Sequence, residues 1–213
     1  MGEIIKYFQT STLAVALENQ IRNSVIIHDE GGDIVREPIS GAKGTIAMVG
    51  VGEKAVVNLR FVARSAGGHA STPEKNTPIV RLGKFMAYVD RHQVFDVDMP
   101  PAIAEMLKVI GRYMGAAGKL MEAADKLRKP LGKLMPVLGA TTGALVSTTI
   151  AFTITGGGDA INVIPGEAWV KADMRCSHHQ GRDASIAAIT KVAARFGIET
   201  EVLEADAESR LAD

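Results

Sequence analysis

The sequence contains a single cysteine, Cys176, among its 213 residues. One cysteine cannot form an intrachain disulfide, and it excludes a zinc site built from several thiolates. A reducing, cytoplasmic environment is therefore the expected location. The sequence also lacks an apolar run of roughly eighteen residues and the basic and apolar regions of a signal peptide, so we expect neither a membrane span nor a secretory leader.

There is no excess charge of either sign, since 24 Lys and Arg residues balance 24 Asp and Glu residues. Without a long-range positive field, neither nucleic acid nor an anionic membrane surface is an expected partner. Hydrophobic residues make up 46% of the chain and charged residues 23%, as in ordinary globular proteins. Function must therefore be sought in particular residues and motifs.

Two hydrophobic periods alternate along the chain from Ala55 onward. A two-residue period predicts strands, and a helical period predicts helices. The strands are expected near 55–65, 147–155, 167–175 and 198–204, and the helices near 78–91 and 184–196. This βαββαβ order is the ferredoxin-like motif, an α+β fold in which two helices cover one face of a four-stranded antiparallel sheet.

The ends of the two helices carry recognisable signals. Thr77 and Asp183 are expected to cap their N-termini, with Pro78 at the first helical position. Gly197 is expected to stop the second helix.

Residues 98–140, between the first helix and the second strand, have helical spacing but are broken by Pro130 and Pro136. Their mixed charges favour a helical hairpin that packs on the domain or on a dimer mate over a membrane-active helix. Before Ala55, the pattern predicts a short helix over 11–22 and strands at Val25–Ile27 and Thr45–Val49.

Two short motifs carry the candidate chemistry. Gly67-Gly68-His69-Ala70-Ser71-Thr72-Pro73 places a histidine on a glycine turn between a strand and a helix. Far along the chain, Asn162-Val163-Ile164-Pro165-Gly166 opens a strand that ends at Arg175. A histidine, a side-chain amide and a guanidinium could together hold an anionic or carbonyl-bearing ligand.

These motifs resemble the lid, or dimerisation, domain of the di-zinc metallopeptidase family of aminoacylase, carboxypeptidase S and succinyl-diaminopimelate desuccinylase. The matching segments are GGHASTP at 67–73 and NVIPGEA at 162–168, about ninety residues apart, and the DEGG at 29–32 resembles the carboxypeptidase S branch. The resemblance implies a lid domain over 54–205 with a helical insertion at 98–140. It also implies that 1–53 are a remnant of the α/β catalytic domain and that 206–213 begin the return to it.

The resemblance also implies roles for four residues. His69 would stabilise an oxyanion in the active site of a dimer partner, Asn162 and Arg175 would bind substrate, and Asp29 would be a zinc ligand. Each has a simpler alternative: a structural or solvated histidine, an asparagine capping a turn, a solvated arginine and a loop acid.

The chain lacks the family's other metal-site motifs, because no His-x-Asp precedes residue 29 and no Glu-Glu pair occurs. One acid cannot hold two zinc ions. We therefore expect a fragment that binds zinc weakly, forms a homodimer and does not hydrolyse substrate alone, whereas the parent would cleave peptides or N-acyl amino acids. The alternative is a non-catalytic ferredoxin-like interaction module.

The expected homodimer follows from the two exposed edges of a four-stranded sheet, which invite pairing with another chain. In the family that the chain resembles, lid domains join edge to edge across a twofold axis. The resemblance implies that the strand leading into His69 lies near that edge.

Overall fold

The computed structural model describes residues 5–6, 27–28, 32–36, 43–49 and 52–207. The chain divides into two compact units. The larger unit consists of Lys54–Pro100 and Arg128–Ser209, and the smaller consists of Met1–Glu53, Pro101–Leu127 and Arg210–Asp213.

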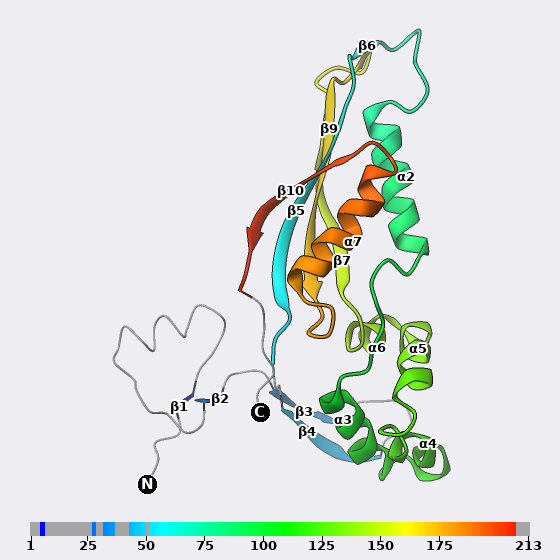
Figure 1. Ribbon diagram of the computed structural model, residues 1–213, viewed down its shortest axis with the longest axis vertical. Helices are drawn as coiled ribbons and strands as arrows, with labels where there is room; N and C mark the ends of the chain where they lie inside the picture. Colours follow the sequence, from blue (N-terminus) through cyan, green and yellow to red (C-terminus); the bar gives the residue numbers. More distant parts are fainter. Residues whose placement is uncertain (1–4, 7–26, 29–31, 37–42, 50–51, 208–213) are drawn as a thin grey trace. The chain divides into compact units, whose positions relative to one another are not determined.

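The larger unit is built on a four-stranded antiparallel sheet (Figure 1). Its strands are β5 (Ala55–Arg64), β7 (Thr149–Gly156), β9 (Glu167–Cys176) and β10 (Glu199–Ala205), in the spatial order β10-β5-β9-β7. Helices α2 (Pro78–Arg91) and α7 (Arg182–Ala194) complete the βαββαβ order. The predicted ferredoxin-like α+β fold is confirmed.

An aromatic cluster joins the sheet to the helices. Phe61 of β5 and Phe85 of α2 are fully buried, with ring centroids 4.8 Å apart. Phe152 of β7 and Phe196 after α7 pack on Phe85 at 5.6 and 6.1 Å. Alternate side chains of β5 and β9 enter this core, as the two-residue period predicts.

The strand that leads into His69 is β5, and it pairs with β10 on one side and β9 on the other. The strand that was expected near an edge is therefore not itself an edge strand, although it lies next to the outer strand β10. Within the described sheet, the outer strands are β10 and β7. Both contain a register shift, between Val202 and Glu204 in β10 and between Phe152 and Ile154 in β7.

The helix ends follow the predicted signals only in part. Thr77 is the N-cap of α2, but its side chain forms no capping bond, and its carbonyl accepts the first helical hydrogen bond from the Arg81 N–H. The N-cap of α7 is Gly181, so the prediction that Asp183 caps it is wrong. Asp183 lies in the first turn, where the hydrogen bond from Arg182 lowers the pKa of its carboxyl. Gly197, which was predicted to stop α7, has φ of 65° and lies in the turn that follows the C-cap Arg195.

The predicted insertion at 98–140 is helical, but it does not form one hairpin. Helices α5 (Arg128–Leu138) and α6 (Ala140–Ala144) belong to the larger unit, and Pro136 lies inside α5 instead of breaking it. Helix α3 (Pro101–Gly111), the 3-10 turn Gly115–Ala117 and α4 (Gly118–Glu122) belong to the smaller unit.

The smaller unit also contains short strands. β3 (Gly32–Arg36) pairs antiparallel with β4 (Thr45–Val49), the strand predicted there, and β1 (Ile5–Lys6) pairs in parallel with β2 (Ile27–His28). The helix predicted over 11–22 and most of the strand predicted at 25–27 lie outside the described residues. Among the described helices, none is long and apolar enough to cross a membrane.

Candidate functional site

The two motifs found in the sequence meet beyond the end of the main sheet. Strand β6 (Gly68–His69) lies beyond the end of β5 (Figure 1). It pairs antiparallel with β8 (Val163–Ile164), and His69 is the register partner of Val163. The Ala70 N–H also donates to the Asn162 carbonyl, 2.9 Å away. We call residues 65–73 and 162–166 the tip. The structure thus brings His69 and Asn162 together, and both side chains are exposed.

A serine at the base of the tip holds its two segments together. The Ser65 hydroxyl donates to the Pro165 carbonyl at 3.1 Å and accepts the Gly67 N–H at 3.0 Å, while the Ser65 N–H donates to the Gly166 carbonyl at 2.8 Å. Gly67 has φ of 73°, and a Cβ there would lie 3.2 Å from the Ile164 carbonyl oxygen. This position therefore requires glycine.

The imidazole of His69 is held by a second serine. Its Nδ1 atom accepts the Ser71 backbone N–H at 3.2 Å and lies 2.7 Å from the Ser71 hydroxyl. Sequence reasoning assigned no role to Ser65 or Ser71, although both stand in or beside the GGHASTP motif. Serine is common in loops, so composition alone gives no signal for either contact.

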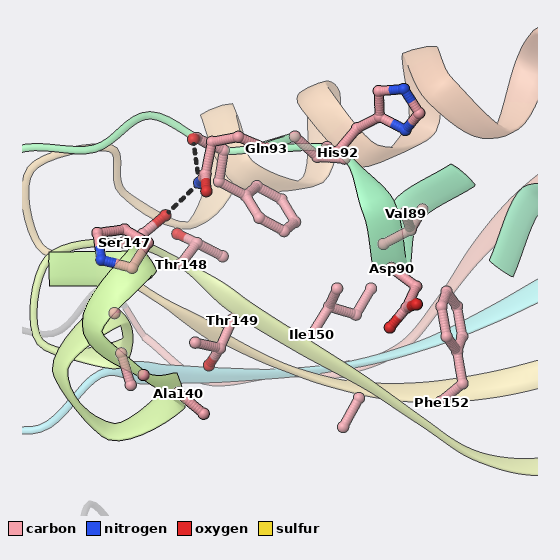
Figure 2. A pocket seen from close by; sticks show the side chains of 17 residues that line it. Val89, Asp90, His92, Gln93, Ala140, Ser147, Thr148, Thr149, Ile150 and Phe152 are labelled. Carbon is pink, nitrogen blue, oxygen red and sulfur yellow. Dashed lines mark hydrogen bonds between the residues drawn. The ribbon is translucent and has the colours of Figure 1, made fainter. Parts of the chain in front are cut away.

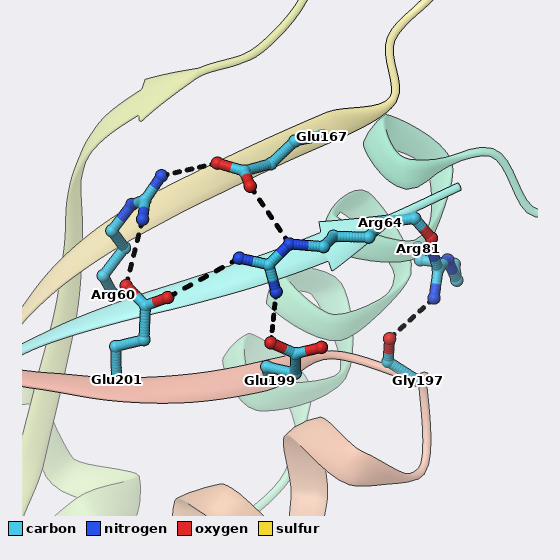
Figure 3. Close-up of polar contacts among 7 residues, drawn as sticks. All are labelled: Arg60, Arg64, Arg81, Glu167, Gly197, Glu199 and Glu201. Atoms are coloured by element: carbon cyan, nitrogen blue, oxygen red, sulfur yellow. Dashed lines mark hydrogen bonds and ion pairs between the residues drawn. The ribbon is translucent and has the colours of Figure 1, made fainter. Parts of the chain in front are cut away.

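Ion pairs join β5, β9 and β10 near the end of the sheet from which the tip extends (Figure 3). Arg60 of β5 contacts Glu167 of β9 at 2.7 Å and Glu201 of β10 at 3.0 Å. Arg64 contacts Glu167 at 3.1 Å and also pairs with Glu199. Each pair is partly solvated, so its individual contribution is small, but together they fix the strand ends relative to one another.

Arg81 of α2 adds a link between the helical layer and the same end of the sheet. Its guanidinium donates to the carbonyl of Gly197 at 2.6 Å and to the carbonyl of Arg64 (Figure 3). The tip therefore extends from a rigid base, which is where precise positioning of a functional side chain is possible.

Arg175 lies far from the tip within one copy of the chain. It pairs with Val56 and Thr149 in the register, whereas Glu167, at the other end of β9, pairs with Arg64 just before the tip. Eight residues of strand correspond to about 26 Å. The Arg175 guanidinium forms a two-pronged ion pair with Asp173, at 2.8 and 3.2 Å. One copy thus does not unite Arg175 with His69 and Asn162.

A separate pocket of about 620 Å³ lies between the C-terminal end of α2, α6 and β7 (Figure 2). Gln93 lines this pocket, and its side-chain amide donates to the Phe95 carbonyl at 2.7 Å and to the Ser147 hydroxyl at 3.0 Å. His92 lines it but stacks on Tyr88, with ring centroids 4.0 Å apart, at the C-cap of α2. The predicted site residues His69, Asn162 and Arg175 do not line this pocket.

The residues that the structure describes contain no group of three or more His, Cys, Asp or Glu side chains able to hold a metal ion. Asp29, the predicted zinc ligand, lies outside them. The described residues alone therefore do not provide the ligands of a zinc site.

Comparison with known proteins identifies the family. A family model described as a peptidase dimerisation domain matches residues 51–201, which is more than half of the chain. The chain belongs to this family, whose parent enzymes are peptidases and amidohydrolases. The predicted family is confirmed, whereas the carboxypeptidase S branch stays a prediction.

Solved structures share the fold at low identity. The dipeptidase Dug1p from Saccharomyces cerevisiae is 13% identical with a TM-score of 0.53, covering 95% of this chain and 46% of its own. A tripeptidase from Staphylococcus aureus is 14% identical (TM-score 0.47; 94% and 39% covered). A hydantoinase/carbamoylase family amidase from Burkholderia ambifaria is 13% identical (TM-score 0.44; 76% and 30% covered).

The chain therefore spans less than half the length of these relatives. A search of curated proteins found no match.

Proposed function

We propose that this chain is the lid and dimerisation domain of a zinc-dependent hydrolase that cleaves the amide bond of peptides or N-acyl amino acids. The observation that supports this most is the β6–β8 pairing, which places an exposed histidine beside an exposed asparagine on a braced tip. The zinc ligands of this proposal lie outside the described residues.

His69 acts as a hydrogen-bond donor to the carbonyl oxygen of the scissile amide. That oxygen gains negative charge in the transition state, and a donor already in place stabilises it without reorganisation. Asn162, the first residue of the tip's second segment, contacts the substrate through its side-chain amide. Arg175 binds the free carboxylate of the substrate, for which a planar guanidinium is well suited.

These roles require two copies of the chain. Since about 26 Å of strand separates the Arg175 end of β9 from the tip end, one small substrate cannot contact both in the same copy. A twofold dimer solves this, because the tip of one copy then meets the Arg175 end of the other, and symmetry creates two such sites.

The outer strand β7 is the better edge for forming this dimer. Strand β10 carries three glutamates, Glu199, Glu201 and Glu204, and charged residues on an edge oppose pairing with a second sheet. The sequence of β7, TIAFTITG, has no charged residue, and its Ile154 is 54% exposed. Antiparallel pairing of two β7 strands places the Gly156 end of one copy, near its tip, beside the Thr149 and Arg175 end of the other.

Replacing His69 by alanine in the complete enzyme tests the donor role. We expect kcat to fall by about 10²–10³-fold, as for removal of other oxyanion donors. Zinc content and dimerisation should not change, because His69 is exposed on the tip and holds neither the sheet nor its edge. His92→Ala is the matched control, since His92 stacks on Tyr88 at the end of α2. Near-normal kcat in His69→Ala, or loss of zinc from it, would contradict the assignment.

A further inference from the structure

We propose that Ser71 is a positioning residue that fixes the ring of His69 and keeps the proton of the neutral imidazole on Nε2. Ser71 lies two residues after His69 and contacts the same ring atom twice, through its backbone N–H and through its hydroxyl. Both residues are exposed, so the ring has no buried surroundings to hold it otherwise.

The backbone contact favours one proton position, and the hydroxyl contact adds to it. An amide N–H can only donate, so the Nδ1 atom that receives it at 3.2 Å must be an acceptor. A neutral imidazole carries one proton on its two nitrogens, which places that proton on Nε2.

The hydroxyl contact then has one consistent direction. With Nδ1 unprotonated, the Ser71 hydroxyl donates to it across the 2.7 Å separation. In the other tautomer the hydroxyl could accept from Nδ1–H, but the Ser71 amide N–H would then face the Nδ1 proton and its bond would be lost. Two donors from one residue thus favour the same tautomer.

The functional consequence rests on the proposed donor role of His69. Only the tautomer protonated on Nε2 can donate a hydrogen bond from the side of the ring that Ser71 leaves free. A loop histidine without this support would rotate and exchange between tautomers in water. Ser71 therefore presents the donor in one orientation before substrate arrives, which is the preorganisation that oxyanion stabilisation requires.

Nitrogen-15 NMR of the imidazole in this chain tests the inference directly. The spectrum is recorded about two pH units above the ordinary histidine pKa of about 6.5, where neutral rings dominate. The resonances absent from His69→Ala identify the ring. In the unaltered chain we expect widely separated nitrogen shifts, with Nε2 of the protonated type and Nδ1 of the unprotonated type.

The variants give the sharper comparison. Ser71→Ala keeps the backbone N–H but removes the hydroxyl donor, so the two nitrogen shifts should move part of the way toward each other as the second tautomer becomes populated. Ser71→Thr, which keeps the hydroxyl, should restore the separation. Thr72→Ala is the matched control, because the Thr72 side chain forms no hydrogen bond among the described residues and only its backbone N–H binds the His69 carbonyl. The control should match the unaltered chain.

Two results would overturn the inference: a proton on Nδ1, or an even tautomer mixture, in the unaltered chain, and nitrogen shifts in Ser71→Ala that equal those of the unaltered chain. These outcomes are independent of catalysis. If His69→Ala kept normal kcat while the NMR results held, the donor role would fail and the tautomer assignment would stand.

Discussion

Burial sets the chemistry of Cys176, the last residue of β9. Its side chain is 2% exposed within the core shared by the sheet and its helices. Removal from water disfavours the charged form and raises the pKa of the thiol, which outweighs the opposing effects of the Ser185 hydrogen bond and the nearby Lys54 charge. The thiolate is the reactive form of cysteine. Burial limits access to it and the raised pKa lowers its fraction, so both slow the reaction of Cys176.

We expect the Cys176 thiol of the folded chain to react with an alkylating reagent about tenfold or more slowly than in denaturing urea at the same pH. Raising the pH increases the thiolate fraction and should narrow the difference. A chain carrying Cys176→Ser and Thr72→Cys provides an exposed thiol on the tip as the control. Equal rates for Cys176 in the folded and unfolded chain would show that β9 is not packed as described.

Single residues also show how far the sequence could predict the site. The glycine pair, the histidine and the NVIP segment indicated that the tip exists, and the structure places His69 and Asn162 together. The bonds of Ser65 could not be predicted, because they depend on which carbonyls the fold brings within reach. The capping prediction for Asp183 failed because Gly181 takes the N-cap position and Arg182 engages the carboxylate.

At the scale of elements, strands were easier to predict than the helical segment at 98–140. β9 alternates along its whole length and β5 along most of it, because one face of each packs on α2 and α7. The helical segment carries a helical period in both its halves, but a local period cannot show that the halves join different units. Strand order is likewise a long-range property, so the sequence could not show that β5 lies between β10 and β9.

The two edge strands offer a matched pair of substitutions for testing the dimer. Thr153 and Leu203 each stand at a register shift, without a register partner in the neighbouring strand. Proline at either position should leave the sheet largely intact, but it removes an N–H donor and bends the strand against pairing.

We expect sedimentation at micromolar concentration to show a dimer for the unaltered chain and for Leu203→Pro, and a monomer for Thr153→Pro. A dimer for Thr153→Pro together with a monomer for Leu203→Pro would show that the chains pair through β10 and not through β7. A monomeric unaltered chain would contradict dimerisation through this domain.

At the scale of the whole molecule, the length of the sheet explains why the proposed site needs two copies. The tip and Arg175 lie at opposite ends of β9. When two sheets pair antiparallel, the tip end of one copy lies beside the Arg175 end of the other. The sequence indicated each of these residues, but the need for a partner becomes clear only when β9 extends as one continuous strand from Glu167 to Cys176.

Mixed dimers of the complete enzyme test this central claim most directly. His69→Ala and Arg175→Ala should each be nearly inactive alone, but a mixed dimer contains one site with an intact His69 from one copy and an intact Arg175 from the other. Random mixing in equal amounts should therefore restore about one quarter of the unaltered activity. Mixing His69→Ala with Asn162→Ala is the control and should restore none, because both residues belong to the tip of the same copy. No recovery with Arg175→Ala, or equal recovery in both mixtures, would contradict a site shared between two copies.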